Sequence, residues 1–115
     1  GVGWLPFVLQ AADYQFQHLA VRRERPEFQM LPSEYFRRQV YACSWFEQVP
    51  PGYVLDHVGV DNLMFETDFP HPTSIYGAEV PATIEHSLSG LDPKVRQRVL
   101  WGNAADLYGV QAPAA

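Results

Sequence analysis

The sequence predicts a parallel α/β fold, and three observations support that prediction. Residues 39–46, rich in β-branched and aromatic side chains, and residues 63–68, which open with the apolar run Leu63–Phe65, are typical of buried strands. A short helical pattern lies between them, and longer helical patterns precede the first run and follow the second. Helices that alternate with strands favour a parallel sheet, so we expect the two strands to run side by side in the same direction.

The helical patterns before the first strand begin with residues 5–20. Apolar side chains recur there at helical spacing, polar side chains lie largely opposite, and Pro6 suits the first turn. Residues 25–32 carry two prolines and mixed polarity, which predicts a surface excursion before the strand at 39–46.

Turn residues divide the second half of the chain. Residues 50–52, Pro-Pro-Gly, break it, and residues 53–58 predict a helix that stops at Gly59. After the strand at 63–68, a polar loop at 69–77 leads to a helix from Pro81 to Gly90. Asp92-Pro93 predicts the start of a helix that runs to about residue 100. Gly102-Asn103 predicts an interruption before a last helix ending at Gly109, and residues 111–115 predict a flexible tail.

The strand at 63–68 ends on acidic residues and passes directly into a proline-rich loop. Alternation along a strand places Glu66 and Asp68 on one face. Pro70 and Pro72 exclude a helix and favour an extended conformation at His71. Two carboxylates and an imidazole therefore converge at one strand end, the edge at which parallel α/β folds gather ligands and catalytic groups.

Asp68 has two interpretations from its position alone. A buried strand ends in a carboxylate when that group is solvated, paired or bound to a cation, which makes Asp68 a candidate metal ligand. The alternative is an aspartate that caps the following loop.

Composition limits the partners of the chain. With 115 residues we expect a single domain, and 13 acidic against 8 basic residues give a formal charge of −5. That balance gives no electrostatic footprint for nucleic acid or an acidic membrane, so we expect a small-molecule substrate and protein partners. The single cysteine, Cys43, indicates a reducing compartment, and no apolar run approaches the roughly 20 residues that span a bilayer. We therefore expect a cytoplasmic protein.

Two segments resemble the C-terminal end of the amidohydrolase-related metal-dependent hydrolases, in the branch that includes the aminocarboxymuconate-semialdehyde decarboxylase-like enzymes. They are residues 65–72, Phe-Glu-Thr-Asp-Phe-Pro-His-Pro, and residues 101–109, Trp-Gly-Asn-Ala-Ala-Asp-Leu-Tyr-Gly. Residues 1–6 are similar to the turn after that family's sixth strand. The resemblance covers nearly the whole chain but only the last part of a complete enzyme.

The resemblance implies that residues 1–115 are a partial domain, the C-terminal portion of a (β/α)8 TIM barrel with residues 39–46 as its seventh strand. A barrel needs roughly 250 residues, and the first strand's His-x-His pair and the fifth strand's histidine are absent from this chain. Asp68 matches the aspartate after strand eight, which binds the metal and handles the proton of the metal-bound water. The implied cofactor of the intact enzyme is a divalent metal, zinc by default, with manganese or iron as alternatives.

Four further residues are candidates for binding the substrate. His71 can bond a substrate carboxylate or stand beside the metal, the alternative being a plain loop histidine. Trp4, Trp45 and Phe46 lie at the ends of strand-type segments, where aromatic side chains can shape an apolar pocket or simply pack in the core. Cys43 lies mid-strand without a neighbouring cation, which favours a structural role.

Two functions remain open. In the first, the chain is part of a metal-dependent enzyme that hydrolyses or non-oxidatively decarboxylates a small carboxylated or cyclic substrate, with Asp68 as ligand and proton acceptor. In the second, the chain is an inactive α/β remnant that acts as an oligomerising or interaction module. Two strands are too few for a stable sheet, so we expect the isolated chain to be a homo-oligomer in either case.

Overall fold

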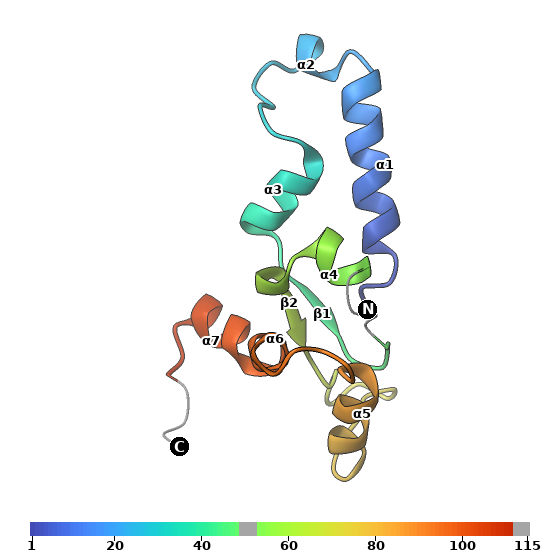
Figure 1. Ribbon diagram of the computed structural model, residues 1–115, viewed down its shortest axis with the longest axis vertical. Helices are drawn as coiled ribbons and strands as arrows, with labels where there is room; N and C mark the ends of the chain where they lie inside the picture. The colour runs from blue at the N-terminus through green and yellow to red at the C-terminus, as the bar shows by residue number, and fades with distance from the viewer. Residues whose placement is uncertain (49–52, 112–115) are drawn as a thin grey trace.

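A computed structural model describes residues 1–48 and 53–111, and it confirms the parallel arrangement of the two strands (Figure 1). β1 (Ala42–Ser44) and β2 (Leu63–Phe65) form a two-stranded parallel sheet in which Cys43 pairs with Met64. The predicted runs 39–46 and 63–68 are too long, because only three residues of each strand pair. One further ladder bond follows, from the Glu66 amide to the Ser44 carbonyl oxygen at 3.0 Å.

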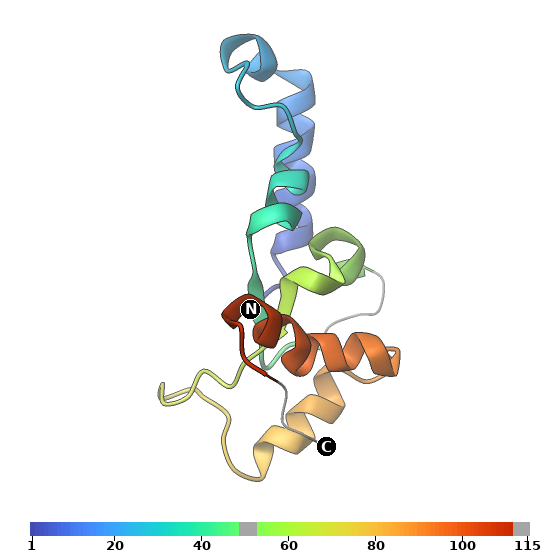
Figure 2. The same ribbon diagram turned by 90° about the vertical axis from the view of Figure 1, so that its left-hand side faces the viewer.

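A helical arm, residues 5–39, extends away from the carboxyl ends of the strands (Figures 1 and 2). It consists of α1 (Leu5–His18), α2 (Val21–Glu24) and α3 (Pro32–Gln39). The predicted helix at 5–20 is confirmed with Pro6 in its first turn, although it ends two residues early. The predicted excursion at 25–32 is also irregular in the structure up to residue 31.

The sequence interpretation missed α3. The Glu34 carboxylate caps its first turn by accepting the Leu31 amide proton at 2.7 Å. The Ser33 hydroxyl donates to Asp13 of α1 at 2.6 Å, and the Ser33 amide donates to the same carboxylate at 2.9 Å. These bonds hold α3 against α1.

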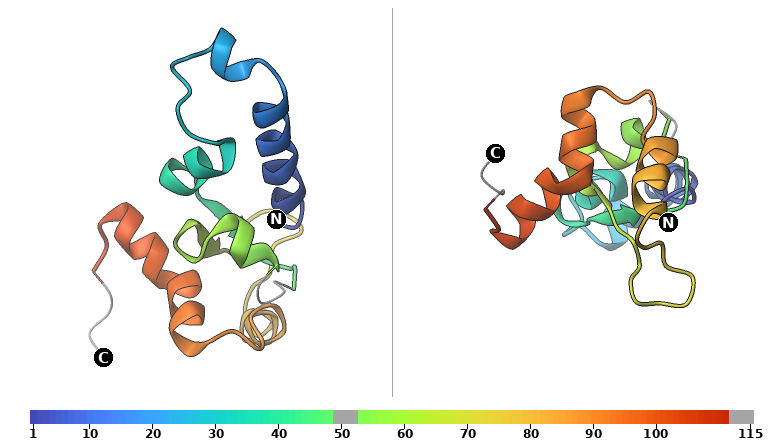
Figure 3. Two further views of the ribbon diagram at one scale, coloured as in Figure 1. Left: turned by 45° about the horizontal axis from the view of Figure 1, so that its top comes forward. Right: turned by 90° about the horizontal axis from the view of Figure 1, so that it is seen from below.

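Helices also connect the strands and complete the chain (Figure 3). They are α4 (Tyr53–Val58), the 3-10 turn η1 (Val60–Asn62), α5 (Glu79–Ser87), α6 (Pro93–Gln97), the π-helical turn η2 (Arg98–Gly102) and α7 (Asn103–Tyr108). Helix α4 ends as predicted at Gly59, whose φ of +94° is accessible to glycine. Asp92 caps α6 as predicted by accepting the Lys94 amide proton at 2.8 Å.

Two of the predicted helix boundaries are wrong. α5 begins at Glu79, so Pro81 lies inside its first turn. The predicted interruption at Gly102-Asn103 does not occur, because Gly102 has helical angles of −60° and −44° and η2 continues directly into α7. The last helix does end at Gly109, whose φ is +66°.

One face of the sheet packs on the helices. Leu63 is fully buried there, and Ala42 and Phe65 pack against the same apolar core. The other core residues come from the start of the chain and from the helices: Val2, Leu5, Leu9, Phe36, Val54, Val58, Leu88 and Val99. Alternation along the strands turns Cys43 and Met64 toward the opposite face.

The Pro-Pro-Gly break at 50–52 and most of the predicted tail at 111–115 lie outside the described residues. Among the residues that are described, every helix is too short or too polar to cross a membrane.

The isolated 115-residue chain is expected to associate with itself. Within the described residues the sheet has two strands, which leaves the outer edge of each without a partner. Large apolar side chains are also exposed, including Phe7 at 73% and Phe69 at 69%. Multi-angle light scattering at micromolar concentration should therefore report a dimer or larger species, and a monodisperse monomer would contradict this expectation.

Candidate active site at the carboxyl edge of the sheet

Asp68 lies three residues beyond the end of β2 and has an unusual backbone conformation. Its φ is +59°, the one positive value at a non-glycine position among the described residues. Aspartate and asparagine tolerate this left-handed region better than most residues. The predicted strand alternation therefore does not extend to Asp68, and the turn, rather than the pleat, sets the direction of its side chain.

The turn brings Asp68 and His71 together. The His71 amide donates to the Asp68 carbonyl oxygen at 2.9 Å, across a cis peptide between Phe69 and Pro70. The imidazole Nδ1 lies 3.3 Å from Asp68 Oδ2 and 3.1 Å from the Thr73 hydroxyl oxygen. With Nδ1 engaged in this way, Nε2 is the nitrogen available to a substrate.

Two backbone hydrogen bonds close the loop that carries Asp68 and His71. The Ile75 amide donates to the Thr67 carbonyl oxygen at 3.0 Å, and the Ser74 amide donates to the His71 carbonyl oxygen at 2.9 Å. The loop projects from the end of β2 at the side of the sheet opposite the helical arm (Figure 2). Asp68 and His71 are partly exposed there and accessible to a ligand.

Glu66, the residue after β2, lies near enough to Cys43 for its charge to act on the thiol. Burial raises the pKa of the Cys43 thiol, and the negative charge of Glu66 raises that pKa further. The thiol therefore stays protonated near neutral pH, which supports a structural role for Cys43.

The three aromatic candidates lie near the carboxyl ends of the strands, but they do not form one cluster. Trp45 and Phe46 follow β1 and contact each other edge to face, with ring centroids 5.1 Å apart. Phe46 lines a groove of about 350 Å³ with Ile75 and one face of α5. Trp4 immediately precedes α1, and its side chain is largely exposed.

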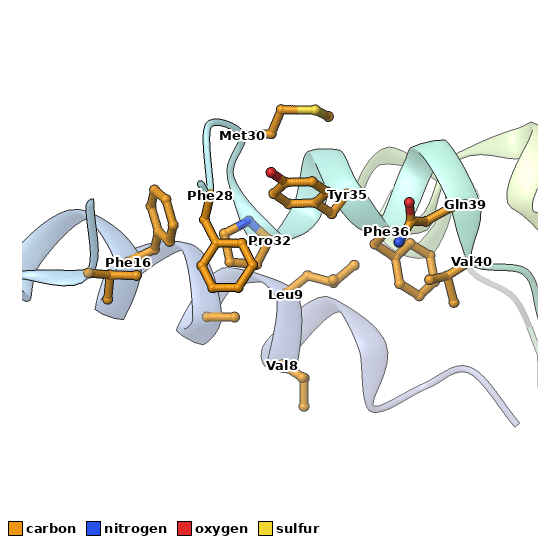
Figure 4. Close-up of a pocket in the computed structure, with 12 residues that line it drawn as sticks. Val8, Leu9, Phe16, Phe28, Met30, Pro32, Tyr35, Phe36, Gln39 and Val40 are labelled. Carbon is orange, nitrogen blue, oxygen red and sulfur yellow. The ribbon is translucent and has the colours of Figure 1, made fainter. Parts of the chain in front are cut away.

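A larger groove than the one beside α5 lies in the helical arm (Figure 4). Its volume is about 530 Å³, and its walls come from α1, α3, the first residue of α2 and the segment between α2 and α3. The lining is apolar apart from Tyr35 and Gln39. This lining contains no acid–base pair and no nucleophile with a neighbouring base, so the end of β2 remains the candidate active site.

The described residues do not complete a metal centre. No three His, Cys, Asp or Glu side chains within 1–48 and 53–111 are grouped to hold an ion. A catalytic zinc site takes about three protein ligands. Asp68 and His71 together bring two potential donors to the end of β2, fewer than such a site takes.

A comparison with models of protein families identifies the family of this chain. The family model described as amidohydrolase matches residues 16–110. The chain belongs to the amidohydrolase family. This family consists of enzymes that generally depend on a divalent metal, and the match spans Asp68, His71 and the Trp-Gly-Asn segment.

Two solved structures resemble this amidohydrolase chain. One is the 5-carboxyvanillate decarboxylase LigW from Sphingomonas paucimobilis, with a TM-score of 0.68 and 25% identity over 94% of this chain and 31% of that one. The other is IDCase from Metarhizium anisopliae in apo form, with a TM-score of 0.66 and 22% identity over 97% and 33%. This chain thus spans about a third of the length of each. Curated protein sequences gave no match.

Sequence reasoning missed two polar side chains that hold the site's scaffold. Asn62, just before β2, donates to the carbonyl oxygens of Arg37 and Val40 at 2.9 and 2.7 Å. Glu47, just after β1, accepts the amide protons of Val2 and Gly3. Their partners lie 22 to 45 residues away in the sequence, so no local pattern could have indicated them.

Proposed function

We propose that this chain is the C-terminal portion of a (β/α)8 barrel enzyme that decarboxylates a small aromatic carboxylate without oxidation. The observation that carries the proposal is the Asp68–His71 pair at the carboxyl edge of β2, inside a segment that matches the amidohydrolase family. Ligands bind at that edge in parallel barrels. The similarity to LigW over 94% of this chain supports decarboxylation rather than hydrolysis.

In such a reaction the bond between the ring carbon and the carboxylate carbon breaks, carbon dioxide leaves, and a proton takes its place on the ring carbon. A bound divalent metal would supply Lewis-acid stabilisation of the negative charge on the substrate. We assign Asp68 two roles, as one ligand of that metal and as the carboxylate that holds the transferred proton. Zinc is the default metal, with manganese or iron as alternatives.

We assign His71 to substrate binding. Asp68 and Thr73 hold its Nδ1, and this orients Nε2 for a hydrogen bond to the substrate carboxylate. We place Trp4, Trp45 and Phe46 around the aromatic ring of the substrate. The chain carries a single cysteine and therefore no internal disulfide, which supports a reducing compartment such as the cytoplasm.

The direct test incubates the full-length protein, loaded in turn with zinc and manganese, with 5-carboxyvanillate and measures carbon dioxide. We expect metal-dependent release of carbon dioxide. Parallel assays with aromatic esters and amides test hydrolysis. Turnover of these compounds alone would overturn decarboxylation and keep the family-level assignment.

His71→Ala in the full-length protein is expected to raise KM about tenfold or more while the metal content stays the same. The physical reason is the loss of one charge-assisted hydrogen bond to the substrate, roughly 1.5–3 kcal/mol. Kinetics beside elemental analysis measure both quantities. His18→Ala, which removes an exposed imidazole from the end of α1 in the helical arm, is the matched control. Loss of metal in His71→Ala alone would make that histidine a metal ligand instead.

The alternative, an inactive interaction module, is favoured by the open sheet edges and the apolar groove of the arm. It would apply if the reading frame proved to begin near Gly1 and the chain bound neither metal nor substrate. Sequencing upstream of Gly1 for the His-x-His segment separates the two functions.

A further inference from the structure

One glutamate ties the end of β1 to the turn that precedes α1. Glu47 Oε1 lies 2.6 Å from the Val2 amide nitrogen and 3.1 Å from the Gly3 amide nitrogen. Two successive backbone amides thus converge on one carboxylate oxygen, the arrangement by which backbone turns bind anions. Here the anion is the Glu47 side chain itself, and its two hydrogen bonds join segments that are more than 40 residues apart in the sequence.

The turn is shaped for this carboxylate. A Cβ atom on Gly1 would lie 2.6 Å from Glu47 Oε1 and 3.0 Å from Glu47 Cδ, so a side chain at Gly1 would displace the carboxylate. A Cβ atom on Gly3 would lie 3.7 Å from the same oxygen, an ordinary contact. The carboxylate therefore requires glycine at the first position and tolerates alanine at the third.

The turn carries Trp4. The indole Nε1 donates to the Gly1 carbonyl oxygen at 3.0 Å, so the ring is attached to the same turn that Glu47 holds. Because Glu47 follows the last residue of β1 by three positions and bonds the Val2 and Gly3 amides, the turn lies near the carboxyl end of β1. Asp68 follows β2 at the same edge.

We propose that Glu47 is a positioning residue, which fixes the turn at residues 1–4 and, through that turn, the Trp4 ring at the border of the substrate site. This inference rests on the proposed function for its effect on substrate binding. Among the described residues Glu47 bonds the Val2 and Gly3 amides and neither Asp68 nor His71, and it does not line the groove beside α5. Its second oxygen, Oε2, is buried and accepts no hydrogen bond from the described residues.

Because Oε2 makes no hydrogen bond among the described residues, replacing Glu47 by glutamine should have a different effect from replacing it by alanine. Both bonds to the turn use Oε1, and glutamine keeps one carbonyl oxygen at that position. Glu47→Gln should therefore keep the turn in place, whereas Glu47→Ala should release it. Gly1→Ala should act like Glu47→Ala, and Gly3→Ala, in the same turn, is the matched control.

The first readout is hydrogen exchange of the Val2 and Gly3 amides in the full-length protein. We expect exchange at least about tenfold faster in Glu47→Ala and Gly1→Ala, which lose the bonds to Glu47 Oε1, and near wild-type rates in Gly3→Ala. Glu47→Gln keeps an oxygen acceptor for both amides, although without the charge, so its exchange should be clearly slower than that of Glu47→Ala. Unchanged protection in Glu47→Ala overturns the proposal. Hydrogen exchange does not depend on catalysis, so it tests whether Glu47 holds the turn even if 5-carboxyvanillate is not a substrate.

The second readout is the steady-state kinetics of 5-carboxyvanillate decarboxylation by the same four variants. A positioning role raises KM about tenfold in Glu47→Ala and Gly1→Ala with kcat within about twofold, the effect of losing roughly one oriented contact to substrate. A purely structural role would instead lower the active fraction and reduce apparent kcat at constant KM. That second pattern, or Glu47→Gln behaving like Glu47→Ala, would overturn the positioning role.

Discussion

Asp68→Asn in the full-length protein is expected to lower kcat about a thousandfold or more, because proton transfer by a placed side chain contributes about 10²–10⁴-fold by itself. The amide keeps the shape of the side chain but loses the negative charge that faces the metal and the basicity that accepts a proton. Asparagine also tolerates the φ of +59° found at this position, so the fold should be unchanged.

The measurement is kcat for 5-carboxyvanillate, with circular dichroism and thermal unfolding to confirm the fold. Asp56→Asn is the matched control, since it removes an exposed carboxylate from α4. We expect the control to retain wild-type activity. Retained activity in Asp68→Asn would remove this residue from the catalytic machinery.

Asn103→Ala is expected to lower the free energy of unfolding by about 2–4 kcal/mol, the cost of two buried acceptors left without donors. The Asn103 side chain is almost fully buried, and its Nδ2 donates to the carbonyl oxygens of Val60 and Leu63 at 2.6 and 2.7 Å. One amide group thereby holds α7 against η1 and the first residue of β2.

Asn103→Asp should be more damaging than Asn103→Ala, because it places a carboxylate against two carbonyl oxygens. Urea unfolding of the full-length protein gives the midpoints. Gln97→Ala, at an exposed position of α6, serves as the control and should shift the midpoint little. A midpoint for Asn103→Ala equal to that of the control would show that the two bonds do not stabilise the fold.

The elements that could be predicted from the sequence are those set by local signals. The helix at 53–58 with its stop at Gly59 and the Asp92 cap each depend on residues within one or two turns. The Asp68–His71 pair was also foreseeable. The two residues are three positions apart in a proline-rich segment that directly follows the predicted strand.

Strand length was not foreseeable in the same way. The predicted strands extended over residues 39–46 and 63–68, yet a strand persists only where another strand pairs with it. β2 therefore ends at Phe65, and the alternation argument for Asp68 failed because a left-handed turn intervenes. The pairing of strands is a property of the tertiary structure that local pattern does not contain.

The helix boundaries failed for a related reason. Gly102-Asn103 is typical of a helix stop in isolation, but Gly102 keeps helical angles and the buried Asn103 side chain bonds the carbonyl oxygens of Val60 and Leu63. These distant partners hold the helix continuous, and no local pattern indicates them. Glu47 and Asn62 were missed because both act on backbone groups distant in the sequence.

The central claim is that Asp68 is a metal ligand in the full-length protein, and elemental analysis of purified Asp68→Gly tests it most directly. Glycine adopts a φ of +59° without strain, so this variant removes the carboxylate and leaves the turn intact. We predict about one equivalent of divalent metal in the wild type, a large loss in Asp68→Gly, and little metal in the isolated 115-residue chain, because a catalytic site needs about three protein ligands. Wild-type metal content in a folded Asp68→Gly protein would contradict the claim.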